Sequence, residues 1–598
     1  MNKILLVTAL LLTAACSPMQ KEKKLSSANS NSFNRLLLDY YDQRMQLYPL
    51  EATQNGDNRY NNILNNDLTV SFREREKAFY QLFQDSLKKF DRPQMAGTDQ
   101  MSYDVLSWET SINLERLHFH ENLMPINQFW SLPLTMAQLG SGSGNQPFKT
   151  VQDYQNFLER INSFSAWCDT AISNMRTGMK QGYVYPKVLM ERVLPELKGI
   201  ISGDVKKSVF YQPIGKLDSM KFSEDDNKRL TDLFVRAIDG QINPSYQKLY
   251  TFISTEYLPG CRSSAGISNI PDGKEYYNFL IKQWTTTSMS ADSIFELGQR
   301  EVNRIRGEMG ETMKQVNFNG SLKDFFNYLH SDPKFFPYQT KEDVLNGYRA
   351  IQDKEKPYLK NLFSVFPKTP FEVRETEAFR EASASAEYNQ GSPDGSRPGI
   401  FYVPITDPKT FNNISMEDLF SHEAIPGHHY QISLQQENTA LPNFRRFIWY
   451  GAYGEGWALY CESLGKNLGL YNDPYQYFGM LSEEMHRAIR LVVDAGIHTK
   501  GWAREQAIEF SKENEAESEA DITSEIERYM AIPGQALSYK VGQLKILELR
   551  KNAQDALGEH FSISKFHDEI LQDGCLPIAV LEAKMNKWIS EQKKKQDS

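Results

Sequence analysis

Cysteine is scarce in this chain, and that scarcity excludes two kinds of stabilising site. The 598 residues include only five cysteines, all widely separated: Cys16, Cys168, Cys261, Cys461 and Cys575. No two of them have the Cys-x-x-Cys spacing of a structural zinc site, and they are too few for a disulfide framework. One isolated bridge stays compatible with an oxidising compartment. A chain of this length can instead bury a large apolar core.

Long apolar runs and excess positive charge are also missing. After residue 12 no segment has the 18 or more apolar residues of a membrane-spanning helix. The formal net charge is -9 and the isoelectric point is about 5.7, which argues against nucleic acid as a partner. The glycine-rich stretch 140–145 lacks the Lys-Ser/Thr ending of a phosphate-binding loop, so we predict an ordinary loop there.

The N-terminus has the features of a bacterial lipoprotein leader. Within residues 1–15 a basic residue is followed by an apolar run and then by small residues directly before Cys16. We predict that 1–15 is a signal peptide and that Cys16 is lipidated, so that the membrane is contacted only through a lipid anchor. Residues 16–32 are predicted to be a flexible tether. Ser17 favours sorting to the outer membrane, where the protein would face the periplasm.

The periodicity along most of the chain predicts a mainly α, multi-helix fold. Long amphipathic runs recur with the 3.6-residue period of a helix, whereas strand signals are few and short. No fixed-period repeat is evident. The principal runs are residues 34–48, 74–90, 151–181, 223–257, 290–316 and 341–363.

The chemistry-bearing residues are concentrated in the second half of the chain. We therefore predict that residues 33–370 form a helical scaffold walling a cleft and that residues 371–598 form the catalytic region, with both parts able to share one core. Residues 399–405 (GIFYVPI) are rich in aromatic and β-branched residues and end near a proline, which predicts a short edge strand. Its free backbone groups could pair with an extended peptide. The alternative is a strand buried within a small sheet.

Residues 422–429 (HEAIPGHH) hold three of the ten histidines of the chain, one of them beside a glutamate. Two histidines and a distant glutamate are the protein ligands of many catalytic zinc sites, which leave one position open for water. In a regular helix, however, His422 and His428 would point to different faces, and Pro426 occupies the position where a second histidine is usual. Pro426 and Gly427 can distort the helix and bring the imidazoles together.

We predict that His422 and His428 bind a zinc ion. His429 is held in reserve as an alternative ligand, an outer group or a contact for a substrate oxygen. The competing interpretation is a Pro-Gly helix break that carries structural or solvated histidines.

Five motifs in the same order resemble those of the bacterial family called domain of unknown function 885. They are DGSRPGIFYVP, SHEAIPGHHYQ, GEGWALYCE, RLVVDAGIHTKGWAREQAI and RYMAIPGQALSYKVGQLKILELR, and the likeness extends over roughly residues 33–590. That family in turn resembles the gluzincin zinc peptidases. The resemblance implies a large, mainly helical protein with a deep cleft and a small β-sheet beside the zinc helix.

Roles for the acidic residues follow from this resemblance. Glu423 is expected to be the general base that activates a zinc-bound water. Glu455 follows Gly454 at the start of a predicted helix and is our choice as the third ligand. Glu462 would lie on the same face two turns later, as a competing ligand or an outer partner of the site. Each glutamate could alternatively be an ordinary surface carboxylate.

Arg490, Asp494 and His498 recur at four-residue spacing and are predicted to share one face of a buried helix. Asp494 could orient a metal-binding histidine, with His498 as a further candidate near the metal. Arg487 or Arg490 could bind a substrate carboxylate through a two-pronged hydrogen bond. The alternative is a structural Arg–Asp–His ladder.

Two tyrosines and two residues of the DGSRPGIFYVP motif complete the candidate site. Tyr539, and after it Tyr529, could stabilise the oxyanion that forms when an amide is attacked. Arg397 and Tyr402 are candidate substrate-binding residues. A core role is the competing interpretation for each tyrosine, because the chain has 30 of them.

These observations predict a zinc-dependent hydrolase, namely a metallopeptidase that cleaves short peptides in the periplasm. The alternative is a non-catalytic lipoprotein that binds peptides or glycans and retains a degenerate metal site. Glu423 is the discriminating residue, because a binding protein needs no base beside the metal.

Overall fold

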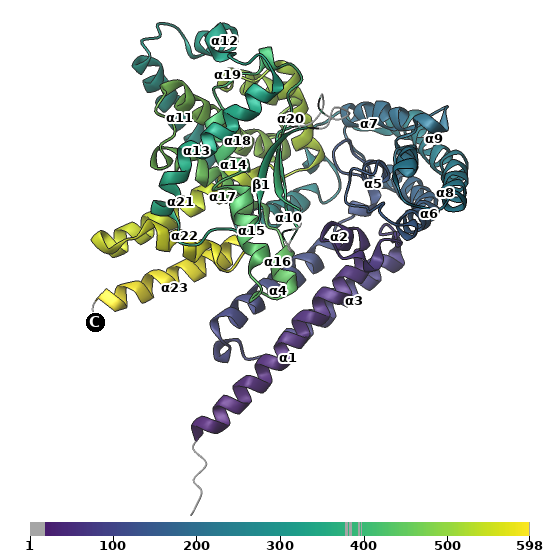
Figure 1. Cartoon of the computed structure of the whole chain (residues 1–598), viewed down its shortest axis with the longest axis horizontal. Coiled ribbons are helices and arrows are strands. Elements are labelled where there is room, and N and C mark those ends of the chain that lie inside the picture. The colour runs from purple at the N-terminus through teal and green to yellow at the C-terminus, as the bar shows by residue number, and fades with distance from the viewer. Residues whose placement is uncertain (1–17, 377–380, 382–384, 393–394, 396, 597–598) are drawn as a thin grey trace, which may run out of the picture.

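The computed structural model describes residues 18–376, 381, 385–392, 395 and 397–596 and is mainly helical, with one small sheet (Figure 1). The mainly α fold expected from the periodicity is therefore confirmed. Helices form wherever the 3.6-residue pattern was strongest, because each buries one apolar stripe against its neighbours. Residues 151–181, for example, form a single helix with the predicted bounds.

The first helices form an elongated group along one side of the molecule, with the N-terminal end of the first extending away from it (Figure 1). They are α1 (Pro18–Leu47), α2 (Pro49–Gln54), α3 (Val70–Leu87) and α4 (Gly97–Arg116). Helix α1 therefore includes residues 18–32 of the predicted tether, where Lys, Glu, Gln and Met are good helix formers. Within the described residues no helix has the length and apolar character needed to cross a membrane.

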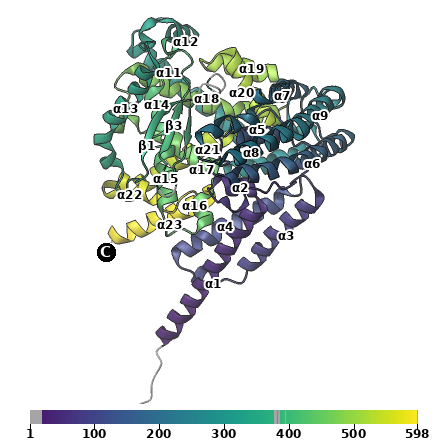
Figure 2. The ribbon, with the colours of Figure 1, turned by 45° about the vertical axis from the view of Figure 1, so that its right-hand side comes forward.

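A second group of helices lies at the right of both views, above α2 and α3 (Figures 1 and 2). It comprises α5 (Leu132–Gly140), α6 (Val151–Gln181), α7 (Lys187–Ile200), α8 (Glu224–Ala237) and α9 (Asn243–Phe252). The chain then returns through α10 (Gly273–Thr285), α11 (Ala291–Gln315), α12 (Leu322–Ser331) and α13 (Lys341–Leu362).

The sheet has three strands in the order β1-β3-β2: β1 (Phe371–Glu375), β3 (Gly399–Val403) and β2 (Glu387–Asn389). Strand β3 pairs in parallel with β1, placing Val373 opposite Phe401, and antiparallel with β2, placing Tyr388 opposite Phe401. The predicted edge strand is thus the central strand, and its backbone groups are used inside the sheet. Its burial on both sides explains the apolar composition that we interpreted as an edge.

The remaining helices carry the candidate site. They are α14 (Met416–Glu423), α15 (His428–Glu437), α16 (Asn443–Phe447), α17 (Gly451–Glu462), α18 (Pro474–Thr499), α19 (Arg504–Asn514), α20 (Glu519–Ala531), α21 (Leu537–Leu557), α22 (Ile563–Leu571) and α23 (Ile578–Gln596). In Figure 2, α14, α15 and α17 lie close to the sheet, between the first-half helices on either side.

Buried apolar side chains form one continuous cluster from Phe33 to Ile589. A smaller cluster of three residues, Ile112, Phe279 and Leu280, lies apart from it. Both the predicted scaffold and the predicted catalytic region contribute to the main cluster, so they share a core.

Candidate metal centre

The histidine segment forms two helices separated by a sharp break. Helix α14 ends at Glu423 and α15 begins at His428, with the backbone folded back on itself between them. A Cβ atom on Gly427 would lie 1.9 Å from the carbonyl oxygen of His422, so only glycine allows this approach. Trp457 on α17 donates from Nε1 to the Pro426 carbonyl at 2.9 Å and fixes the break from the opposite side.

This break brings His422 and His428 together. Their ring centroids are 4.8 Å apart and the rings are perpendicular. Oε2 of Glu455 lies 3.6 Å from Nε2 of His422 and 3.3 Å from Nε2 of His428. In a tetrahedral zinc site with ligand distances of about 2.0–2.1 Å, neighbouring ligand atoms lie about 3.3 Å apart. Both distances from the Glu455 oxygen are therefore close to the spacing of neighbouring ligands in such a site.

Glu423 lies at the same cluster, since a ligand atom from each of His422, Glu423 and His428 lies within 4.8 Å of the other two. We assign the ligand position to Glu455 because its oxygen is close to both Nε2 atoms. Burial and the neighbouring Glu455 raise the pKa of Glu423, whereas the two histidines and the backbone N–H of Tyr388 oppose that rise. Glu423 thus lies beside the histidine nitrogens and accepts a hydrogen bond from the backbone of strand β2.

Glu462 lies behind His422, where its Oε1 is 2.6 Å from Nδ1 of that histidine. A buried carboxylate at this nitrogen fixes the proton on Nδ1 and leaves the lone pair of Nε2 directed toward Glu455. Tyr471 supports the glutamate by donating to its backbone carbonyl at 3.0 Å. Of the two roles predicted for Glu462, its position corresponds to that of an outer partner.

His429 is turned away from the cluster. Its Nδ1 lies 3.1 Å from the Tyr388 hydroxyl and 3.4 Å from Oγ of Ser433, and its ring packs on Phe371 of β1. Burial lowers the pKa of His429 to about 4, so the ring stays neutral at physiological pH. Its contacts are with the sheet, while His428 is directed to the ligand cluster.

A cavity of about 1070 Å³ opens in front of the cluster. His422, Glu423, His428 and Glu455 line it, and strand β2 contributes Glu387 and Tyr388 to the same wall. Strand β2 is one of the two edge strands of the described sheet, so an extended chain that enters the cavity would meet its backbone next to the cluster.

Tyr539 lines this cavity, and burial together with the charge of Glu455 raises the pKa of its hydroxyl. The Arg490 guanidinium lies over its ring, 4.6 Å from the centroid. Tyr529 has a different position: it is buried, and its hydroxyl donates to Glu525 at 2.8 Å. Tyr539 therefore faces the candidate site, while Tyr529 belongs to the structure behind it.

The two candidate arginines both line the cavity but have partners within the protein. Arg487 pairs with Glu483 one turn earlier on α18. Arg490 bonds Glu525 at 3.0 Å and the Tyr529 hydroxyl at 3.1 Å. Nη1 of Arg490 and Nε of Arg487 have no hydrogen-bond partner among the described residues, so each arginine keeps one donor that its partners in the protein do not use.

Asp494 and His498 do not reach the histidine cluster. Asp494 accepts from the Tyr277 hydroxyl at 2.5 Å and from the Gly534 N–H at 3.1 Å. His498 bonds the N–H of Ile267 and the carbonyl of Tyr529, at 2.9 and 3.0 Å. The shared helix face was predicted correctly, but it packs on α10 and the α20–α21 turn. Asp494 therefore has its contacts away from the histidine pair, and Glu462 is the carboxylate that contacts His422.

The remaining predicted residues lie outside the cluster or beyond the description. Arg397 is exposed and lines a neighbouring cavity of about 440 Å³. Tyr402 is in the central strand, opposite Arg374 on one side and Glu387 on the other. Cys16 and the predicted signal peptide lie outside the described residues.

Sequence reasoning missed two residues of this site. Tyr388 contacts Glu423 and His429 from a strand of only three residues, too short for a period-2 pattern to be recognised. Trp449 packs against His428 with ring centroids 5.8 Å apart and lines the cavity. In the sequence, Trp449 is marked only by its position five residues before the GEGW motif, and that position does not indicate a function.

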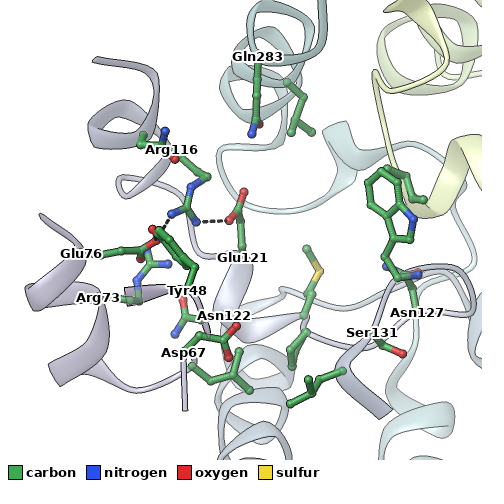
Figure 3. Close-up of a pocket in the computed structure, with 18 of the residues that line it drawn as sticks. Tyr48, Asp67, Arg73, Glu76, Arg116, Glu121, Asn122, Asn127, Ser131 and Gln283 are labelled. Carbon is green, nitrogen blue, oxygen red and sulfur yellow. Dashed lines mark hydrogen bonds and ion pairs between the residues drawn. The ribbon is translucent and has the colours of Figure 1, made fainter. Parts of the chain in front are cut away.

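A second cavity, of about 670 Å³, lies among α3, α4 and α10 and shares none of its described lining residues with the first. Arg116 lies between Glu76 and Glu121 and pairs with both (Figure 3). Elsewhere in this cavity Arg44 bonds Glu51 at 2.8 Å. Arg116 and Arg44 are thus matched by carboxylates within the protein.

The fold and the site together define a mainly helical protein with a histidine–glutamate cluster at the base of a large cavity. The chain belongs to the family of bacterial proteins of unknown function called DUF885, whose sequence profile matches residues 49–585. The family predicted from the motifs is therefore confirmed.

Two solved structures are similar to this chain over nearly its whole length. A candidate lipoprotein from Colwellia psychrerythraea is 28% identical, with a TM-score of 0.87 and coverage of 94% of this chain and 100% of that chain. A candidate lipoprotein of unknown function from Shewanella oneidensis is 20% identical, with a TM-score of 0.73 and coverage of 93% and 99%. No curated protein matches the chain. The lipoprotein character expected from Cys16 agrees with how both neighbours are described.

Proposed function

We propose that this protein is a zinc-dependent peptidase of the gluzincin type that acts in the cell envelope. One observation carries the proposal: Nε2 of His422 and Nε2 of His428 face the same carboxylate oxygen of Glu455 at 3.6 and 3.3 Å. Two imidazole nitrogens and a carboxylate oxygen that converge in a buried site form a donor set that a cation would complete.

The donor set suits zinc. Two imidazoles and one carboxylate are the protein ligands of many zinc hydrolases, and the cavity leaves the fourth side accessible. Glu462 at Nδ1 of His422 supplies the outer carboxylate that commonly accompanies such ligands. Bound zinc would polarise a substrate carbonyl and lower the pKa of water.

Glu423 is the proposed general base. Its carboxylate lies beside the ligand atoms and lines the cavity, so it can take a proton from an attacking water and later pass it to the leaving amine. The Tyr388 N–H holds this carboxylate from strand β2. Tyr539 presents its hydroxyl to the same cavity and is the proposed donor to the developing oxyanion.

A peptide is the proposed substrate because an edge strand borders the cluster. Strand β2 lies beside Glu423 with one edge paired to β3, and an extended peptide can add to the other edge through backbone hydrogen bonds. Such pairing would align an amide with the cluster. Short, flexible peptides suit a cavity of this kind better than folded proteins.

The proposed location is the outer membrane, facing the periplasm, with Cys16 lipidated. This rests on the N-terminal sequence and on the description of the two structural neighbours. Labelling of cells with a clickable fatty acid tests it: wild type should incorporate label, and Cys16→Ala should not. Label in both proteins would contradict the proposed anchor.

The activity is tested by measuring zinc content and cleavage of a mixed peptide library by one purified protein. We expect one zinc per chain, cleavage that a chelator abolishes and added zinc restores, and loss of cleavage in Glu423→Gln. Zinc binding without cleavage would favour the non-catalytic binding protein. A chain without zinc, or cleavage that survives in Glu423→Gln, would contradict the proposed mechanism.

A further inference from the structure

Trp449 is a large apolar side chain that stays unusually exposed beside the metal centre. It is 42% exposed, in the short connection between α16 and α17. Its ring lies 5.8 Å from the His428 ring, and it lines the same cavity. Large aromatic groups left exposed in a concave site commonly contact a ligand, because covering them removes apolar surface from water.

The Trp449 indole packs directly against the backbone of Gly454. A Cβ atom on Gly454 would lie 2.0 Å from Cη2 of Trp449, with two further ring atoms at 2.4 Å. Glycine is among the least favourable residues in a helix interior, yet it occupies the turn of α17 directly before Glu455. The indole therefore rests directly on the backbone that carries a proposed zinc ligand, and its position is coupled to the position of that ligand.

Several apolar side chains line the same cavity as Trp449, among its polar and charged residues. Phe447 and Ile448 precede it in the chain, and Leu419 of α14 and Ile432 of α15 line the same cavity. Helix α14 carries His422, and α15 carries His428. A ligand group that contacts Trp449 is therefore held within a few ångströms of a histidine of the cluster and meets an apolar surface there.

We propose that Trp449 forms the wall of a subsite that accepts an apolar, preferentially aromatic, side chain of the residue next to the bond that is cleaved. This inference rests on the proposed peptidase function. The indole excludes water from one side of such a side chain and stacks with it if it is aromatic. Burial of a phenylalanine ring in place of an alanine methyl should raise kcat/KM by about 10- to 100-fold.

The preference is measured first by cleavage. A heptapeptide library with Ala, Leu, Phe, Lys and Glu at every position identifies the bond that the zinc-loaded protein cleaves and the residues that flank it. The kcat/KM ratio is then measured for two peptides that differ only by Phe or Ala at the preferred flanking position. Wild type should favour Phe by about 10- to 100-fold, Trp449→Ala should reduce that ratio to below about 3-fold, and Trp449→Phe should keep most of it.

Trp130 provides a matched control. It is 54% exposed and lines the second cavity, where its ring lies 5.6 Å from that of Trp284. Trp130→Ala removes the same chemical group and should leave the Phe/Ala ratio as in wild type. Circular dichroism and thermal unfolding of each variant check that the protein remains folded.

A binding measurement separates this inference from the proposed function. Calorimetric titration of zinc-loaded Glu423→Gln with the Phe and Ala peptides should show tighter binding of the Phe peptide, and Trp449→Ala in the same background should remove the difference. Binding of this type without cleavage by wild type would contradict the peptidase and support the subsite. Cleavage with no Phe preference, or with a preference that persists in Trp449→Ala, would overturn the subsite and leave the peptidase. Neither cleavage nor peptide binding would overturn both.

Discussion

The two large cavities of this protein differ in how their charged groups are satisfied. In the second cavity Arg116 is matched by Glu76 and Glu121 (Figure 3), and Arg44 by Glu51 and Glu109. In the first, two imidazole nitrogens converge on a carboxylate oxygen at 3.3 and 3.6 Å. A cation would complete the histidine–glutamate arrangement of the first cavity, whereas ion pairs within the protein already satisfy Arg116 and Arg44 in the second.

The carboxylates of the two cavities therefore have different roles: those paired with arginine contribute to stability, whereas the one beside two imidazoles can bind a metal ion or a proton. A carboxylate paired with arginine is held ionised and in place, so its removal leaves an opposite charge uncompensated. A carboxylate beside two imidazoles can bind a metal ion or move a proton. Cavity size alone does not distinguish the two sites, because both are large and both are lined by charged residues.

The same carboxylate-to-amide change in each cavity should give the largest contrast. Glu423→Gln should lower kcat/KM by about 10²- to 10⁴-fold with zinc still bound, because an amide cannot accept the proton of the attacking water. Glu121→Gln changes the second cavity in the same way and should leave kcat/KM within about 3-fold of wild type. Steady-state kinetics on one peptide measure both. Equal losses in the two variants would remove the distinction between the cavities.

The reverse contrast is expected for stability. Arg116→Gln leaves buried Glu76 without its cationic partner and should lower the free energy of unfolding by about 3 kcal/mol. Zinc affinity should be unchanged. Urea denaturation and zinc titration measure the two quantities. An Arg116→Gln protein as stable as wild type would show that these ion pairs do not stabilise the second cavity.

Glu462→Gln tests the outer partner of His422. The amide keeps the shape of the side chain but cannot hold the Nδ1 proton as strongly, so zinc affinity should fall by about 10- to 100-fold. Competition with a chromogenic chelator measures the dissociation constant. Asp494→Asn, a buried carboxylate with no contact to the cluster, is the control and should bind zinc as wild type does. Similar losses in both variants would contradict the assignment of Glu462.

Buried histidines outside both cavities give the smallest effect, one of pH. Burial lowers the pKa of His498 and of His567 to about 3, below the unfolded value of about 6.5. The folded state holds both rings neutral, so this stability is present above pH 6.5 and is lost as the pH falls from about 6.5 toward 3. Each histidine should contribute a slope of about 1.4 kcal/mol per pH unit in that range.

Urea unfolding of wild type and His498→Gln at several pH values between 4 and 7 measures this slope. In His498→Gln the slope of the unfolding free energy against pH should be smaller than in wild type by the contribution of one histidine. An unchanged slope would show that His498 is already protonated in the folded protein.

The sequence predicted the long helices and the histidine pair but not how the surrounding elements meet. Helix α6 followed from its apolar period, which reports one buried face whatever packs against it. The Pro426-Gly427 break correctly indicated that a regular helix could not hold the site. The sequence favoured His428 and kept His429 in reserve, because a distorted helix has no fixed register for either residue, and the contacts of His429 with the sheet separate the two.

Errors arose where the position of a neighbouring element decided the outcome. The spacing of Asp494 predicted the helix face on which it lies. It could not predict that Tyr277 and Gly534 would be the hydrogen-bond donors to its carboxylate. The apolar sequence of β3 correctly indicated that this strand is buried. The position of β3 in the sheet, however, depends on β1 and β2, two short strands with weak sequence patterns. Contacts of that kind join residues distant in the chain and leave no local period.

Diffraction at the zinc absorption edge, from crystals grown with one equivalent of zinc, tests the central claim most directly. We predict a single anomalous peak within about 2.0–2.3 Å of Nε2 of His422, Nε2 of His428 and a carboxylate oxygen of Glu455. A peak elsewhere, or none between these three side chains, would contradict it.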